Sequence, residues 1–409
     1  MKRFLNKLRY VKAKDIWSIF VMLAAIPYAK RIRKQRNYIW LICENGMEAR
    51  DNGFWLYRYI CGNHLETDAV YVISEKSPDY RKVSELGREI VEPGTIRHWA
   101  YYMAAEYNIS SQKAGKPDAA VCYLLEVYGF WKNKRIFLQH GIIHNDLEFL
   151  HYPNTKMAMF ICGAEPEYRY VKEHFGYPEG AVKYLGLARF DGLYDIHPKR
   201  FILIMPTWRK YIATPGRFSK KFDGSETFIQ TNYFKAWEEF FRDRELDEYL
   251  EKYHWEILFY PHRNMQRFLP YFSSQSKHIH FADWRKYDVQ ELLRDASLLV
   301  TDYSSVAMDF AYMGKPLLYY QFDLEEFRTL QYSEGYFDYE KNGFGPVCFS
   351  YLQVKEKLCE AEDGEFINDE KYLSRIRALY SIHDNHNCER IYNAIAADQR
   401  VKRTAGNAR

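Results

Sequence analysis

Strand-like apolar runs alternate with helix-like segments along most of this 409-residue chain, and this alternation limits the fold more than any other feature. A first series begins at Tyr38 and continues to about Leu185, and a second series begins at Phe201. Such alternation is typical of parallel sheets with helices on both faces. The polar, proline-containing stretch 195–200 separates the two series. Because the chain is also too long for one ordinary core, we expect two domains.

The pattern therefore predicts an α/β protein of two Rossmann-like domains that face each other across a cleft. The expected boundaries are 37–197 for the first domain and 198–385 for the second, with 386–409 as the end of a last helix and a frayed tail. Open α/β sheets bind ligands beyond the carboxyl ends of their strands. Polar motifs at predicted strand ends are therefore the candidate functional residues.

The stretch 298–310, LLVTDYSSVAMDF, runs from a predicted strand through a polar turn into a predicted helix. The first N–H groups of such a helix, together with the hydroxyls of Ser304 and Ser305, suit an anion and above all a phosphate. Ser304 on its own would more simply cap the helix. Asp302 in the turn and Asp309 in the helix are further candidates.

Two histidines follow predicted strands, one in each expected domain. His140 precedes Gly141, and glycine lets a ligand or a neighbouring backbone approach the imidazole. His262 follows Pro261 at the end of another strand. Histidine accepts protons near neutral pH, and as imidazolium it neutralises phosphate. A single histidine is more often structural, but two at strand ends of different domains favour a common site.

The motif Pro206-Thr207-Trp208-Arg209 lies at a third predicted strand end. Arginine binds phosphate bidentately and tryptophan stacks on flat groups, whereas the structural alternative is a packed Trp beside a surface Arg. The sequence has no Walker-type phosphate loop and no dinucleotide-binding glycine motif, which argues against a P-loop enzyme and a dinucleotide-dependent dehydrogenase.

The seven cysteines are scattered and form no C-x-x-C pair, and no His or Cys metal cluster is present in the sequence. This pattern favours a reducing compartment and argues against a structural zinc site. We expect no cofactor and no protein-bound metal, and a divalent ion that accompanies a phosphate ligand stays compatible with the sequence.

Residues 1–36 combine an apolar run, 16–29, with basic flanks. They carry eleven Lys or Arg and one Asp, a net charge of +10, whereas the rest of the chain carries −6, so we expect no nucleic-acid partner. The run is short for a bilayer crossing, which takes about 20 residues. We predict a membrane-associating segment that lies in the interface with its basic residues facing anionic lipid. A signal peptide and a first helix of the N-terminal domain are the alternatives.

The motifs considered together are QHG (139–141), GLARFD (186–191), MPTWR (205–209), YPH (260–262), and VTDYSS (300–305) through GKP (314–316). In their order and spacing, they resemble the CDP-glycerol glycerophosphotransferases of bacterial teichoic acid and capsule synthesis. The resemblance covers roughly residues 38–350 and departs from the family at Ala188, often Pro there, and at Pro261-His262, where the order is usually reversed. Within the GLARFD motif, Arg189 and Asp191 become candidate residues.

The resemblance implies a GT-B architecture, with an acceptor domain first and a domain for the CDP-linked donor second. It also implies a peripheral enzyme on the cytoplasmic face of the bacterial cell membrane. His140 and His262 are then the catalytic candidates, the first as general base and the second as a ligand of the donor phosphate. The expected donor-binding residues are Pro206, Thr207, Arg209, Asp302, Ser304 and Ser305.

The expected reaction transfers a polyol phosphate, glycerol phosphate in the first place, from a CDP-activated donor to a hydroxyl of a lipid-linked or polymeric acceptor, with release of CMP. Another GT-B transferase with a CMP-sialic acid or UDP-sugar donor is one alternative, and a non-catalytic membrane-associated scaffold of the same fold is another. The sequence does not separate glycerol from ribitol, or a primase from a polymerase.

Overall fold

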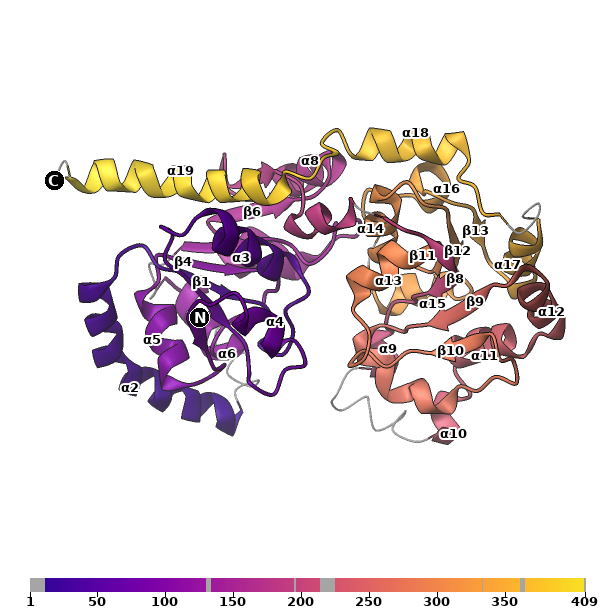
Figure 1. Ribbon diagram of the computed structural model, residues 1–409. Coiled ribbons are helices and arrows are strands. Elements are labelled where there is room, and N and C mark those ends of the chain that lie inside the picture. The colour runs from indigo at the N-terminus through magenta and orange to yellow at the C-terminus, as the bar shows by residue number, and fades with distance from the viewer. Residues whose placement is uncertain are drawn as a thin grey trace. The chain divides into compact units, whose positions relative to one another are not determined.

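The chain divides into two compact α/β units (Figure 1). The computed structural model describes residues 12–129, 134–194, 196–213, 225–332, 334–360 and 365–407. The expected α/β class with two parallel sheets is confirmed. The units differ from the expected domains, because the N-terminal segment and the last helix both fall in unit 1. Unit 1 consists of Met1–His140, Glu148–Gly192 and Asp384–Arg409, and unit 2 of Gly141–Leu147 and Leu193–His383.

Unit 1 is built around a parallel sheet of seven strands in the order β3-β2-β1-β4-β5-β6-β7. In β1, Trp40 and Ile42 join one buried cluster, whereas Leu41 and Cys43 join another. This division follows from the two-residue repeat of a strand and means that both faces are covered. The strands are β1 (Trp40–Cys43), β2 (Ala69–Val72), β3 (Ile90–Val91), β4 (Tyr107–Ser110), β5 (Lys134–Phe137), β6 (Met159–Cys162) and β7 (Val182–Tyr184).

The last helix, α19 (Asn387–Asn407), returns to unit 1 and packs on α3 (Asn52–Asn63), as Figure 1 shows in yellow and indigo. Its Ile391 is fully buried there, and further along Asp398 pairs with Lys134 of β5. The prediction of a frayed tail is therefore wrong for the described residues, because α19 continues to Asn407. The remaining helices are α4 (Tyr80–Ser84), α5 (Ile96–Ala104), α6 (Ala119–Val127), α7 (Tyr152–Thr155) and α8 (Glu165–His174), with 3₁₀ turns η1 (Glu148–Leu150) and η2 (Ala188–Leu193).

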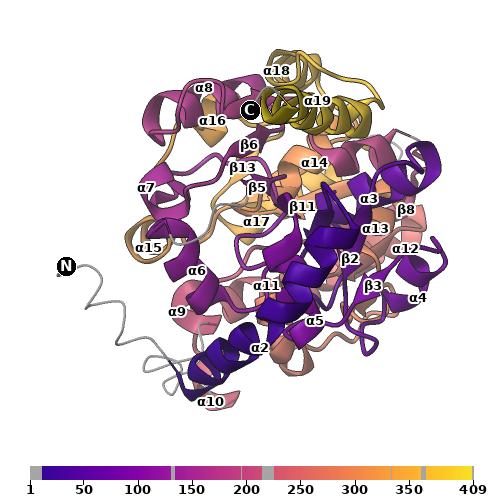
Figure 2. The ribbon, with the colours of Figure 1, turned by 90° about the vertical axis from the view of Figure 1, so that its left-hand side faces the viewer.

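The N-terminal apolar run forms part of helix α2 (Ala13–Gln35), which lies along α5 in both views (Figures 1 and 2). Ala25 and Ala29 are buried against the unit, and the small alanine side chains let the two helices approach closely. The outer face exposes Trp17 and Phe20, at 69% and 60%. The segment is thus a helix of unit 1 and not a separate body. Among the described residues, no helix combines the length and the apolar character that a bilayer crossing requires.

Unit 2 contains a second parallel sheet, of six strands in the order β10-β9-β8-β11-β12-β13. Strands β9, β8 and β11 are neighbours, so the motifs that follow them meet at one edge of the sheet. The stretch from about Tyr211 to Thr231 is rich in Lys, Gly and Ser and predicts an irregular insert, and its residues 214–224 lie outside the described residues. The strands are β8 (Lys199–Ile204), β9 (Glu256–Phe259), β10 (Ile279–Phe281), β11 (Ala296–Thr301), β12 (Leu317–Tyr320) and β13 (Val347–Cys348).

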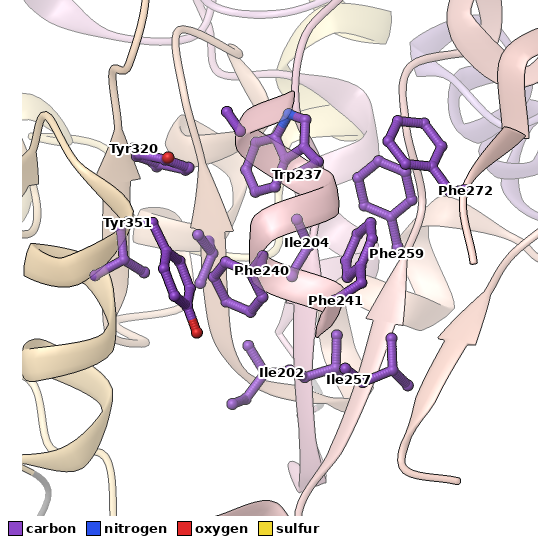
Figure 3. Close-up of a cluster of buried hydrophobic side chains, with 14 of the residues drawn as sticks. Ile202, Ile204, Trp237, Phe240, Phe241, Ile257, Phe259, Phe272, Tyr320 and Tyr351 are labelled. Atoms are coloured by element: carbon purple, nitrogen blue, oxygen red, sulfur yellow. The ribbon is translucent and has the colours of Figure 1, made fainter. Parts of the chain in front are cut away.

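Aromatic side chains form the core on one face of this sheet (Figure 3). Trp237 and Phe241 of α11 (Asn232–Arg242) pack on Phe259 of β9, with ring centroids 5.8 and 4.9 Å away. The sequence pattern over 233–249 predicts one helix, but the structure has two, because Asp243 accepts a hydrogen bond from the Leu246 N–H and starts α12. The other helical segments are α9 (Lys210–Ala213), α10 (Ser225–Phe228), α12 (Arg244–Tyr253), η4 (Arg263–Tyr271), α13 (Val289–Asp295), α14 (Val306–Tyr312), α15 (Leu324–Leu330), α16 (Tyr339–Asn342), α17 (Tyr351–Cys359) and α18 (Glu370–Leu379).

Candidate functional site

Unit 1 carries an exposed histidine with a buried carboxylate behind it. His140 follows β5, and its Nδ1 lies 2.5 Å from Oδ2 of Asp51, the residue that caps α3. The His140 side chain is 65% exposed, whereas that of Asp51 is only 11% exposed. The imidazole is therefore accessible from solvent while one of its nitrogens is held by the protein.

Arg189 and Asn52 complete this arrangement. The Arg189 Nη1 donates to Asp51 Oδ1 at 2.8 Å and to the His140 carbonyl at 2.7 Å. The Asn52 side chain donates to the Gln139 carbonyl at 2.7 Å and accepts from the Arg189 N–H at 2.9 Å. Gln139 has a φ of 70°, a conformation that costs energy for a residue with a side chain. The backbone before His140 is thus held in place by Asn52.

The charge state of Asp51 follows from its neighbours. Burial disfavours the carboxylate, but His140, Arg189 and the Asn52 N–H outweigh it and hold the pKa of Asp51 below its ordinary value. The Glu44 carboxylate accepts a hydrogen bond from the Asp51 N–H at 3.1 Å, and burial and then repulsion from Asp51 raise the pKa of Glu44 to about 8. An ionised Asp51 only accepts hydrogen bonds, so His140 Nδ1 is the donor in this pair, which leaves Nε2 as the proton acceptor whenever the ring is neutral. This is the arrangement of a general base.

Asp51 was not among the residues predicted from the sequence. Its signal is the Asp51-Asn52-Gly53 turn, which directly precedes the first helix after β1. The predicted candidate Asp191 has a different role. Its Oδ1 accepts from the Asn387 N–H and its Oδ2 from the Cys388 N–H, both at 2.8 Å, so Asp191 anchors the start of α19. In this structure the Asp191 carboxylate therefore has a structural contact, which the sequence did not predict.

In unit 2, the predicted motifs after β9, β8 and β11 do lie at one edge of the sheet. The His262 N–H donates to the Pro206 carbonyl at 3.2 Å. The His262 ring stacks on the Trp208 ring, with ring centroids 6.1 Å apart and an interplanar angle of 25°. The His262 Nδ1 accepts from the Asn264 N–H at 3.2 Å. His262 and Trp208 are both partly exposed, whereas Pro206 and Thr207 are buried. Within this loop, Trp208 thus offers the accessible side chain.

Arg209 and Asp302 do not have the exposure that a donor ligand needs. Both side chains are 0% exposed, and the Arg209 guanidinium binds Asp302 at 2.8 Å and Asp323 at 2.7 Å. Asp302 also accepts from the Thr207 N–H at 2.8 Å, which ties the loop after β8 to the turn after β11. A buried guanidinium requires such carboxylate partners. The burial of both side chains favours a positioning role over the expected direct contact with a phosphate.

The Ser304-Ser305 turn leads into α14. Both serines are partly exposed, and the Ser304 hydroxyl accepts from the Val306 N–H at 3.4 Å. Ser305 occupies the capping position, but its side chain makes no cap bond to the helix. The hydroxyls of this turn can therefore meet a ligand. Asp309 is buried within α14, so its carboxylate is not an exposed ligand.

The segment Gly141–Leu147, which begins with the candidate Gly141, belongs to unit 2. Its buried His144 places Nε2 at 3.1 Å from both the Tyr303 carbonyl and the Tyr339 hydroxyl. Burial lowers the pKa of His144 to about 4, so the ring is neutral. His144 thus contacts the residue directly before Ser304, a role that its sequence position did not reveal.

The described residues contain no group of three or more His, Cys, Asp or Glu placed to hold a metal ion.

A family model described as CDP-Glycerol:Poly(glycerophosphate) glycerophosphotransferase matches residues 182–397, more than half of the chain. The chain is 29% identical to the minor teichoic acid biosynthesis protein GgaB of Bacillus subtilis over 368 residues, 88% of this chain and 40% of that protein. It is 27% identical over 246 residues to the teichoic acid ribitol-phosphate polymerase TarL of Staphylococcus aureus, 56% of this chain and 39% of that one.

Solved structures show the fold. The wall teichoic acid polymerase TagF superposes with a TM-score of 0.62 at 15% identity, over 96% of this chain and 99% of that chain. The UDP co-structure of MnaA from S. aureus superposes with a TM-score of 0.54 at 11% identity, over 89% and 97%. These likenesses show a GT-B-like architecture. The chain spans about 40% of the length of the curated relatives named above.

Proposed function

Since the chain belongs to the CDP-glycerol:poly(glycerophosphate) glycerophosphotransferase family, we propose that it transfers a polyol phosphate from a CDP-linked donor to a hydroxyl of a lipid-linked or polymeric acceptor. Glycerol phosphate is the first candidate for the transferred group, and ribitol phosphate is the second. The observation that carries the proposal is the exposed His140 with Asp51 and Arg189 behind it. This arrangement provides a base for activating a hydroxyl.

In the proposed step, His140 Nε2 takes the proton of the acceptor hydroxyl as that oxygen attacks the β-phosphorus of the donor. The new oxygen–phosphorus bond forms while the bond from the β-phosphorus to the bridging oxygen breaks. CMP leaves with that oxygen and its electron pair. Asp51 stabilises the imidazolium that results, and Arg189 keeps Asp51 in place.

We assign donor binding to the exposed groups at the sheet edge of unit 2. The hydroxyls of Ser304 and Ser305 and the imidazole of His262 offer hydrogen bonds to the pyrophosphate, and Trp208 offers a flat face. Arg209 and Asp302 act through the backbone, because they hold the loop and the turn that carry these groups. Preorganised donors of this kind neutralise the charge that develops on the leaving CMP.

We also propose peripheral attachment to the cytoplasmic face of the cell membrane through α2. Its outer face exposes Trp17, Phe20 and Leu23, and its C-terminal end exposes Lys30 and Lys34. Apolar side chains that enter the lipid interface, next to basic ones that meet anionic head groups, support such attachment. A fluorescence titration of Trp17 with anionic vesicles tests it, and equal signals with anionic and neutral vesicles would count against it.

The activity is tested by incubating the protein with CDP-glycerol, CDP-ribitol, CMP-sialic acid or a UDP-sugar, together with a membrane acceptor fraction, and by measuring the nucleotide released. We expect CMP from a CDP-polyol, and only when acceptor is present. The same fold occurs in a UDP co-structure, so a transferase with a UDP-sugar or CMP-sialic acid donor is kept as the second candidate. Release of UDP or sialic-acid-derived CMP, with none from the CDP-polyols, would replace the proposal by that candidate.

A further inference from the structure

A cavity of about 620 Å³ in unit 2 begins at the residue that follows His262. Its walls come from η4, after β9, and from the loop after β10. These two strands are neighbours in the sheet, and both elements follow the carboxyl ends of their strands. The cavity therefore lies at the same edge of the sheet as His262, on the side of β9 opposite to β8 and β11.

Gln266 holds the two walls together. Its Nε2 donates to the Pro261 carbonyl at 2.9 Å and to the Ala282 carbonyl at 3.2 Å, and its Oε1 accepts from the Trp284 N–H at 3.3 Å. One side chain thus links the end of β9 to the end of β10. The walls are fixed by the protein and do not depend on a ligand for their shape.

The lining is strongly cationic. Arg263, Arg267 and Arg285 contribute three guanidinium groups, and Asp283 is the acidic lining residue, paired with Arg285 at 3.0 Å. The Arg263 guanidinium lies 3.7 Å over the centre of the Trp284 ring, and burial lowers the pKa of Arg263 from its ordinary value. A partly desolvated guanidinium gains from an anion, and its flat face and the indole also suit apolar CH groups.

We propose that this cavity binds phosphodiester groups of the polyol-phosphate acceptor chain, an inference that rests on the proposed function. Charge decides between this ligand and the donor. A nucleoside beyond the pyrophosphate is uncharged, whereas a polyol-phosphate chain carries a negative charge on every unit. Several guanidinium groups around one cavity suit the ligand with repeated charges. The site would hold the chain behind the end that reacts.

The test compares binding of synthetic oligo(glycerol phosphate) of increasing length, measured by calorimetry, with the KM for CDP-glycerol. The test variant is Arg267→Gln/Arg285→Gln, which removes two exposed charges and keeps Arg263 and Gln266. Arg377→Gln, an exposed arginine of α18 in the same unit, is the matched control. Arg267→Lys/Arg285→Lys keeps the charge and is expected to recover most of the binding.

We expect the double glutamine variant to bind a long oligomer about tenfold more weakly, a single-unit acceptor much less so, and the control to match the wild type. Equal binding of long oligomers by variant and wild type would overturn the proposal. A raised KM for CDP-glycerol with unchanged oligomer binding would also overturn the proposal, because the cavity would then bind the phosphates of the donor. Failure of the proposed function would give a different result, because the wild-type protein would then release no CMP from any CDP-polyol.

Discussion

Each unit has its own parallel sheet, and the six strands of unit 2 follow the same order as the first six of unit 1, but the two units use the polar groups at their strand ends differently. In unit 1, the titratable side chain is exposed and its charged partner is buried, as in His140 and Asp51. In unit 2, the charges of Arg209 and Asp302 are entirely buried, and hydroxyls, an imidazole and an indole lie outside them. We propose that the first arrangement serves as a general base and that the second fixes the shape of a donor-binding surface.

The largest effect is expected from His140→Gln. The substitution removes the proton acceptor but keeps a side chain of similar size and polarity, so we expect kcat to fall by roughly 100- to 10,000-fold. CMP release at saturating donor measures it. His174→Gln, an exposed histidine at the end of α8, is the control and should keep wild-type turnover. A His140→Gln enzyme that turns over normally would remove the distinction between the units.

The second effect is on stability and concerns unit 2. Arg209→Met leaves Asp302 and Asp323 as uncompensated buried charges, so we expect unfolding to become easier by about 3–5 kcal/mol. Urea denaturation measures this free energy. Arg200→Met, which removes an exposed ion pair with Glu365, is the control and should cost about 1 kcal/mol or less. If both variants lost the same small free energy of unfolding, the buried ion pairs of Arg209 would not stabilise unit 2 as we infer.

A smaller catalytic effect is expected from Asp51→Asn. The amide keeps the volume but loses the charge, and it can turn the His140 ring to the wrong tautomer, so we expect kcat to fall roughly 100-fold. The nearby anion also makes the imidazole more basic, so its loss should move the acid limb of the pH–rate profile to lower pH. Asp118→Asn, at the cap of α6, is the control. An unchanged pH profile would mean that Asp51 has only a structural role.

The smallest effect is expected from Ser305→Ala. One hydroxyl contact to a charged phosphate is worth about 1.5–3 kcal/mol, which corresponds to a rise of roughly tenfold or more in the donor KM. Since the Ser305 side chain makes no cap bond, stability should stay unchanged. Ser350→Ala is the opposite control, because Ser350 does cap α17, and its loss should lower stability and leave the donor KM alone. Lower stability with an unchanged donor KM in Ser305→Ala would instead mean that Ser305 stabilises the helix and does not bind the donor.

Much of this fold could be predicted from local patterns. Apolar runs that end in polar residues located the strand ends at His140, His262 and Ser304, because strands buried on both faces leave that signal. The partners across long sequence distances left no such signal. Nothing near Arg209 in the sequence indicates that Asp323 completes its burial, and nothing near Asp191 indicates that it anchors α19. Short strands such as β3, with two residues, give too little pattern to detect.

Equilibrium binding of CDP-glycerol, measured beside CMP release on the same preparations, tests the division between the two units most directly. We expect His140→Gln to bind the donor as the wild type does and to release CMP roughly 100- to 10,000-fold more slowly. We expect Ser304→Ala/Ser305→Ala to lose donor affinity but to recover turnover at high donor concentration. Loss of donor binding in His140→Gln, together with unchanged donor affinity in the double serine variant, would contradict it.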